Sequence, residues 1–148
     1  MKTSLLKSLF ITTVLGCMAM GCKNDEVASV NTNNEFTFGS DKYTGSCTAV
    51  SSQICKGSTD VGITSTKSLL VYNMPTASSG NFTITNGWAA NPACNIYVLI
   101  QKESGDVSAS INGTLTKTGE KSFTLSTVLS ASPSASSTIA ATASGTYK

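Results

Sequence analysis

The chain of 148 residues contains no histidine and no arginine, so all ten of its basic residues are lysines. Histidine is the side chain that titrates near neutral pH and is the commonest metal ligand, and arginine is suited to bidentate recognition of carboxylate or phosphate. A Ser-His-Asp or Cys-His catalytic site is therefore excluded, and so is a zinc site with histidine ligands. We expect no cofactor, because the side chains that most cofactor and metal sites use are missing.

Charge of either sign is also scarce, since charged residues make up only 12% of the chain. The formal net charge of +2 includes Lys2 and Lys7, close to the N-terminus. If the residues before Cys22 are removed, eight lysines balance eight acids. A neutral chain without arginine lacks the electrostatic footprint of nucleic-acid binding, so no nucleic-acid partner is expected.

The few carboxylates do not indicate an enzyme. Two of them could catalyse glycoside hydrolysis without histidine, but only at a separation of about 5 to 9 Å. Most of the acids fall in predicted turns, where they favour solvation and capping, and nothing in the sequence brings two of them together. No Asp-rich loop has the ligand spacing of a calcium site. The acids expected in turns are Asp41, Asp60, Glu103, Asp106 and Glu120.

The N-terminus has the pattern of a secretory signal peptide. A lysine-bearing opening, MKTSLLK, precedes about fourteen mostly apolar or small residues, SLFITTVLGCMAMG. This run is too short to span a bilayer comfortably as a permanent helix. A buried core helix is the alternative, but the position at the end of the chain and the lysine flank disfavour it. We therefore predict a signal peptide over residues 1–21.

Cys22 stands where apolar sequence gives way to polar sequence. The stretch AMGC places a small residue directly before this cysteine, and KNDE follows it. It resembles the lipobox of bacterial lipoproteins, in which the cysteine thiol is joined to a diacylglycerol and becomes the new N-terminus. Cys17 fits loosely, but the sequence after it stays apolar, so Cys22 is the predicted lipidation site. Two or more acyl chains would anchor it stably in a membrane.

The sequence after Cys22 resembles that of surface lipoproteins of the Bacteroidota. Lys23, Asp25 and Glu26 are similar to their short Lys-acidic export tag. YNMPTASSGNFTI, and the sequence from KTGEKSF to the closing SGTY, resemble short β-rich lipoproteins of the same group. The resemblance implies a lipid-anchored protein of the outer membrane that is exposed on the cell surface, and it transfers no active site. Residues 22–34 are polar and predict a flexible tether with a reach of roughly 20 Å.

Residues 35–148 have the length of one domain and the pattern of an all-β fold. Ser and Thr supply 39 of the 126 residues after Cys22, but apolar residues alternate with them at period two, which favours a folded domain over a disordered stalk. About eight short strands with turn signals between them predict an antiparallel β-sandwich, and a small β-barrel is the alternative. The strands are expected within residues 35–50, 67–75, 80–87, 94–102, 107–119, 121–130 and 137–147.

Three cysteines follow Cys22, namely Cys47, Cys55 and Cys94. Export favours a disulfide between two of them and leaves one thiol over. Cys47 and Cys55 could clamp a hairpin loop, whereas pairing either of them with Cys94 would join distant strands. The choice depends on separations in space, so the sequence leaves it open. A catalytic thiol is disfavoured because no histidine is present to activate it.

The loop TNGWAANPACN, residues 85–95, is the predicted recognition site. It carries the only tryptophan, Trp88, among Asn, Gly and Pro residues. An exposed ring can stack on a sugar or anchor a protein contact, and Asn86 and Asn91 could add amide hydrogen bonds. The alternative is that Trp88 folds back and caps the core.

These features indicate two classes of function. The first is a non-catalytic surface module that binds a glycan or a protein. The second is a structural or accessory subunit of an outer-membrane complex. A small hydrolase or a protease inhibitor is a distant third.

Overall fold

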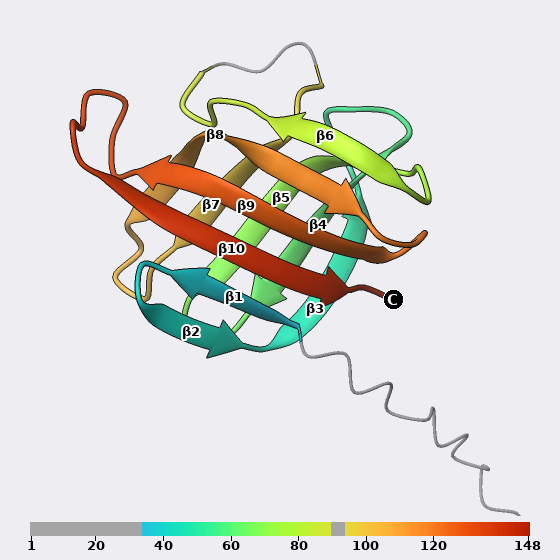
Figure 1. Ribbon diagram of the computed structural model, residues 1–148, viewed down its shortest axis with the longest axis horizontal. Coiled ribbons are helices and arrows are strands. Elements are labelled where there is room, and N and C mark those ends of the chain that lie inside the picture. Colours follow the sequence, from blue (N-terminus) through green and yellow to red (C-terminus); the bar gives the residue numbers. More distant parts are fainter. Residues whose placement is uncertain (1–33, 90–93) are drawn as a thin grey trace, which may run out of the picture. The chain divides into compact units, whose positions relative to one another are not determined.

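The computed structural model describes residues 34–89 and 94–148, and all the regular secondary structure in them is β-strand (Figure 1). Buried and exposed side chains alternate along the strands, as the period-two pattern predicts. The strands are β1 Glu35–Phe38, β2 Asp41–Thr44, β3 Ser46–Ser51, β4 Ser58–Thr64, β5 Ser68–Pro75, β6 Gly80–Ile84, β7 Tyr97–Gln101, β8 Val107–Lys117, β9 Ser122–Ser130 and β10 Thr138–Thr146.

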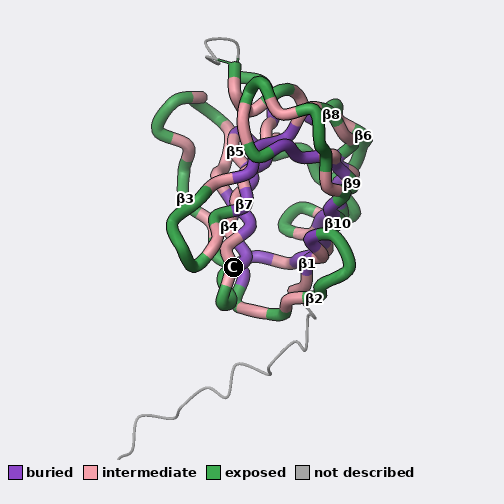
Figure 2. Tube along the Cα trace, turned by 90° about the vertical axis from the view of Figure 1, so that its left-hand side faces the viewer, coloured by how far each residue is buried: buried purple, intermediate pink, exposed green. Residues whose placement is uncertain are grey.

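These strands form one antiparallel sheet in the order β2-β1-β10-β9-β8-β7-β5-β4-β3, and β6 pairs with the second half of β8. The two end strands of this order, β2 and β3, are consecutive in the chain. The sheet therefore curls nearly into a closed barrel, and its walls face one another across a shared core (Figure 2). The prediction of an antiparallel all-β domain is confirmed, and the curled sheet fits both the sandwich and the barrel descriptions.

Gly45 forms the corner between β2 and β3. Its N–H donates to the carbonyl of Asn34 at 3.0 Å. A Cβ atom on Gly45 would lie 1.9 Å from the carbonyl oxygen of Thr64, at the end of β4. Only glycine allows the two backbones to come this close. The chain can thus leave β2, which pairs with β1, and continue as β3, which pairs with β4.

The core is built from side chains of both walls that are buried almost completely. Large residues of β1 are paired with small residues of β10: Phe36 with Ala143, and Phe38 with Ala141. This complementarity explains why β10, which is rich in alanine, still contributes to a well-filled core. The large residues buried to less than 2% exposure include Ile63, Leu69, Met74, Ile84, Ile100, Leu115, Phe123 and Leu129.

A lysine is buried among these apolar residues. Lys117, the last residue of β8, is 2% exposed. Its ammonium group donates to the carbonyl of Glu120 at 2.6 Å and to the hydroxyl of Tyr147 at 2.8 Å. The ammonium also lies 5.0 Å from the centre of the Tyr147 ring. Oxygen acceptors and an aromatic face thus hold the charge, in a way that the sequence did not indicate.

The structure divides the second half of the expected first hairpin and adds a strand. The predicted strand around residues 43–49 is split at Gly45, and residues 58–64, which were not predicted as a strand, form β4. The pairing of β4 with β5 shifts between Thr59 and Val61, because Tyr72 and Asn73 of β5 together lie opposite Asp60, and this bulge breaks the alternation in β5. Asp60 lies within β4 and Asp41 begins β2, so their expected positions in turns are wrong. Ten strands result, where about eight were predicted.

Candidate functional site

Trp88 lies half-buried against the outer side of the sheet. Its indole N–H donates to the hydroxyl of Ser130, the last residue of β9, at 2.9 Å. Leu99 faces outward, because it alternates with core residues along β7. Ala109 of β8 is paired with Leu99, and Ser130 is paired with Ala109, so Ser130 lies on the same outer side. The ring is therefore fixed by a hydrogen bond on the outside of the barrel, and part of it is open to solvent.

Asn86 shapes the loop that carries Trp88. The Asn86 side-chain oxygen accepts a hydrogen bond from the backbone N–H of Trp88 at 2.9 Å, which is the geometry of an Asx turn. Its amide oxygen is thus used to form the turn, and the rest of the side chain is exposed to solvent. Asn91, the other amide predicted at this site, lies outside the described residues.

Two tyrosines form a stacked pair on the same outer side of the sheet. Tyr72 of β5 is paired with Tyr97 of β7, and their ring centres are 4.6 Å apart with an angle of 6° between the planes. Both side chains are half-buried. Such stacked rings form a rigid apolar surface with hydroxyl groups at its edge. The sequence contained a signal for this pair, because both tyrosines occupy outward positions of their strands, where a large aromatic ring is not needed to fill the core.

Gly87 joins the tryptophan loop to the tyrosine pair. A Cβ atom at Gly87 would lie 3.3 Å from the Tyr97 ring and 3.2 Å from the Ala109 side chain, so the loop backbone packs closely on the sheet. The Gly87 N–H also donates to the carbonyl of Ser110 at 2.8 Å. Tyr72, Tyr97 and Trp88 thus lie on the same outer side of the sheet, linked through the Gly87 backbone, and we call these four residues the aromatic face.

A hollow of about 240 Å³ lies beside the aromatic face, on the outer side of β3, β4 and β5. Gly62 lies in the middle of its floor, paired with Thr48 on one side and Leu70 on the other. The absence of a side chain at Gly62 creates the depression, because a Cβ there would reach within 3.1 Å of Leu70. The residues around it include Thr48, Val50, Asp60, Thr64, Leu70 and Tyr72.

Asp60 is the charged residue of this hollow. One of its carboxylate oxygens accepts a hydrogen bond at 2.9 Å from the backbone N–H of Asn73, which has a positive φ of 56°. The side chain of Asn73 is buried, accepts from the hydroxyl of Ser52 at 2.9 Å and donates to the carbonyl of Asn95 at 3.0 Å. The β4–β5 bulge is thus tied to two loops, and Asp60 is held in a defined orientation at the end of the hollow.

The surroundings of Tyr72 and Tyr97 raise the pKa of both hydroxyl groups. Burial, and then the negative charge of Asp60, raise the pKa of Tyr72 above its ordinary value. Burial also raises the pKa of Tyr97, with further contributions from Tyr72 and Asp60. Both phenols are therefore neutral hydrogen-bond donors throughout the physiological pH range.

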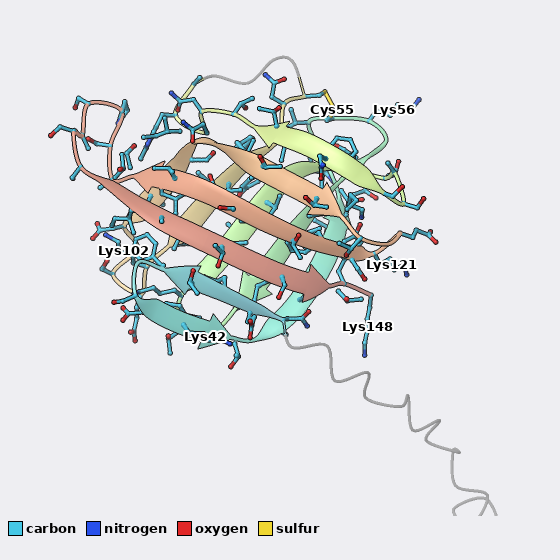
Figure 3. The ribbon with its side chains drawn as sticks, viewed as in Figure 1. Lys42, Cys55, Lys56, Lys102, Lys121 and Lys148 are labelled. Atoms are coloured by element: carbon cyan, nitrogen blue, oxygen red, sulfur yellow. A yellow bond between two sulfur atoms is a disulfide. The ribbon has the colours of Figure 1, made fainter. Side chains whose placement is uncertain are left out.

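Cys55 and Cys94 form a disulfide, with a Cα separation of 5.3 Å. Of the pairings that the sequence left open, the structure contains the one that joins the loop after β3 to the end of the Trp88 loop. Cys55 and the neighbouring Lys56 lie in the loop between β3 and β4, at the top of the view in Figure 3. Cys47 is the free thiol, and burial raises its pKa to about 11. A thiol with such a pKa is protonated and unreactive at neutral pH.

Several predicted features lie outside the described residues. Cys22, the signal peptide and the tether up to residue 33 belong to the part of the chain that is not described. Residues 34–89 and 94–148 contain no cluster of three or more His, Cys, Asp or Glu side chains that could hold a metal ion. The same residues include no helix long and apolar enough to cross a membrane.

Comparisons of the chain with protein-family models, with curated proteins and with solved structures found no match. Any functional assignment therefore rests on the geometry of the aromatic face and on the sequence patterns.

Proposed function

We propose that this protein is a non-catalytic binding module, anchored to the outer membrane by a lipid on Cys22, which presents the aromatic face to a glycan or a protein at the cell surface. The anchor and the location rest on the lipobox-like sequence and on the Lys-acidic residues that follow it. The absence of histidine and arginine from the whole sequence supports a role in binding over a role in catalysis.

The aromatic face is the observation that carries this proposal. Three large rings are gathered on one outer surface, and each of them is half-buried. Elsewhere the outer positions of the strands are mostly Ser and Thr, as in β9 and β10. Large amphipathic rings supply most of the binding energy at many recognition sites, because they bury a large area at a small cost in conformational entropy.

The rings of the aromatic face are also held in place before any ligand binds. The indole of Trp88 is fixed by its bond to Ser130, and Tyr72 and Tyr97 hold each other by stacking. A site that is already ordered loses less side-chain freedom on binding, which increases affinity. The labelled lysines lie around the periphery of the domain (Figure 3), and none of them lines the hollow beside this face.

Binding can be tested by applying the detergent-extracted protein to a glycan array and by pull-down from native membranes. We expect a captured ligand, and we expect Trp88→Ala and Tyr97→Ala each to reduce capture at least tenfold, as at other aromatic anchors. Thr124→Ala is the control, because Thr124 is an exposed residue of β9 that lies outside the aromatic face. Equal capture by all four proteins would contradict the role of this face.

The lipid anchor needs a separate experiment. Metabolic labelling with a fatty acid analogue should mark the wild-type protein, and Cys22→Ala should abolish the label and release the protein from membranes. Cys17→Ala is the control, because it removes the nearby cysteine that fits the lipobox less well. Labelling that is lost with Cys17 and kept without Cys22 would move the anchor to the earlier position.

A specific observation favours a second function, that of an accessory subunit in a membrane complex. Among the described strands, β3 pairs only with β4, so its other edge is open to a strand from a partner. Val50 and Ile54, near this edge, are 64% and 62% exposed. If the edge is the interface, Ile54→Lys will abolish co-purification of a membrane partner, whereas Trp88→Ala will not change it.

A further inference from the structure

The hollow beside the aromatic face combines features that suit one class of ligand. Its floor is apolar and flat, since Gly62 and Leu70 lie side by side there on β4 and β5. Tyr72 forms one wall. Because Tyr97 stacks on Tyr72 from the β7 side, the hollow lies on the opposite side of the Tyr72 ring, toward β4. A ring that entered the hollow would continue the stack formed by the two tyrosines.

Polar groups surround this apolar floor. The hydroxyl-bearing residues Thr48 and Thr64 line the hollow on β3 and β4, and Asp60 stands at its end. One carboxylate oxygen of Asp60 is held by the N–H of Asn73 at 2.9 Å, so the carboxylate has a fixed direction and keeps its second oxygen as an acceptor. A carboxylate that accepts hydrogen bonds from hydroxyl groups forms stronger bonds than a neutral acceptor does.

We infer that the hollow is a subsite for one pyranose ring of a neutral glycan, which extends the proposed function of the aromatic face. A pyranose has an apolar C–H face that stacks on an aromatic ring and hydroxyl groups around its edge that bond to carboxylate and hydroxyl oxygens. A purely apolar ligand would desolvate the Asp60 carboxylate and leave its second oxygen without a hydrogen bond. An acidic sugar would bring a second negative charge beside Asp60, where no lysine lines the hollow to offset it.

The volume of the hollow limits what can enter. At about 240 Å³ it accepts a single small ring and excludes a bulky aromatic side chain together with its backbone. The rest of the glycan would extend over Tyr72 and Tyr97 toward Trp88, along the direction in which the aromatic face continues. A ligand of two or more sugar units is therefore expected to bind more tightly than a monosaccharide.

Two substitutions fill the hollow without changing a residue of the aromatic face. Thr48→Tyr places a ring into it from the exposed side of β3. Gly62→Val fills it from the floor, where the nearest obstacle is the end of the Leu70 side chain at 3.1 Å. Thr124→Tyr makes the same change at an exposed position of β9, three strands further along the sheet from β5, and serves as the control. Asp60→Asn removes the charge but keeps an oxygen for the Asn73 N–H.

The full chain, extracted in detergent, is applied to an array of neutral and uronic-acid-containing oligosaccharides, and the affinity for the strongest neutral ligand is then measured by calorimetry. We expect wild type and Thr124→Tyr to bind neutral pyranosides with equal affinity, and Thr48→Tyr and Gly62→Val to bind at least about tenfold more weakly. Asp60→Asn is expected to weaken neutral binding about fivefold to tenfold and to abolish the discrimination against uronic acids.

The inference and the proposed function fail in different ways. If both filled variants bind the glycan like wild type while Trp88→Ala does not, the hollow is not a subsite and the aromatic face still is a binding site. If wild type binds no sugar but captures a membrane protein, the inference is overturned and the binding function stands. The same holds if a lysine-rich peptide occupies the hollow in place of a sugar. If wild type binds neither sugars nor membrane proteins, both are wrong.

Discussion

Replacing Gly45 with alanine tests whether the corner between β2 and β3 holds the barrel together. The new Cβ would lie 1.9 Å from the carbonyl oxygen and 2.6 Å from the carbonyl carbon of Thr64. Ordinary van der Waals contact begins near 3.4 Å, so the two backbones would have to separate by about 1.5 Å. Thr64 cannot move freely, because it is paired with Ser46 on β3 and with Ser68 on β5.

The size of the effect follows from these contacts. Forcing an extra methyl group into a packed site costs about 1 to 3 kcal/mol. The displacement would also break the Gly45–Asn34 hydrogen bond and weaken the pairing at Thr64, at about 1 kcal/mol for each bond. We therefore expect the free energy of unfolding to fall by about 3 to 5 kcal/mol, a large part of the roughly 5 to 15 kcal/mol that stabilises a domain.

Urea unfolding of the purified protein, followed by the fluorescence of the single tryptophan, Trp88, measures this change. Gly119→Ala is the matched control, because the nearest atom to a Cβ there is Ser122 Cβ at an ordinary 3.5 Å. Gly119→Ala should stay within about 0.5 kcal/mol of wild type, as most surface substitutions do. If Gly45→Ala is equally harmless, the corner is not constrained as described and the reasoning is refuted.

Three further predictions concern the buried cysteine, the disulfide and the buried lysine. Reducing Cys55–Cys94, which closes a loop between residues 39 apart, should lower the free energy of unfolding by up to about 4 kcal/mol, measured by urea unfolding with and without reductant, and an unchanged midpoint would refute this. Burial raises the pKa of Cys47 from 9.0 to about 11, so the unfolded chain releases this proton at a lower pH than the folded chain does. The free energy of unfolding should therefore fall as the pH rises from 9 to 11, by about 2 kcal/mol at pH 11. Unfolding curves of Cys47→Ala should lack this part of the loss. Lys117→Met removes a buried ammonium that pairs with no carboxylate of residues 34–89 and 94–148, and it should be neutral or stabilising. Tyr147→Phe should cost about 1 to 3 kcal/mol, because it takes an acceptor from that ammonium. A methionine variant less stable than the phenylalanine variant would contradict this.

The sequence predicted the strands where side-chain alternation was regular. β5, β9 and β10 alternate buried residues with half-buried or exposed ones over most of their length, and turn residues mark their ends. β4 was missed because Asp60 and Gly62, residue types that are depleted in strands, alternate with its buried Val61 and Ile63 and give the segment the composition of a turn. Gly45 was also not recognised as a corner, since its closest neighbour is Thr64, a residue that only the closing of the sheet brings near.

The site was predicted in part. Trp88 was chosen because a ring in a loop of small and polar residues has few core contacts, and the structure leaves it half-buried with its N–H bonded to Ser130. The hydrogen bond joins residues 42 apart in the chain, which no local pattern reveals. The stacking of Tyr72 on Tyr97 depends on the register between β5 and β7, and the hollow depends on the position of Gly62 between two neighbouring strands. Register and strand order follow from the whole fold and are absent from any single segment.

The pairing of β1 with β10 has a consequence for the way in which the chain acquires its fold. Glu35 is paired with Ser144, so the first strand of the domain has no neighbour on this side until nearly the last residues are available. During synthesis the sheet would therefore stay unclosed until the last strand is available. Closure then comes late and depends on contacts of long sequence separation, which makes folding slow and leaves the unfinished edges open to chaperones.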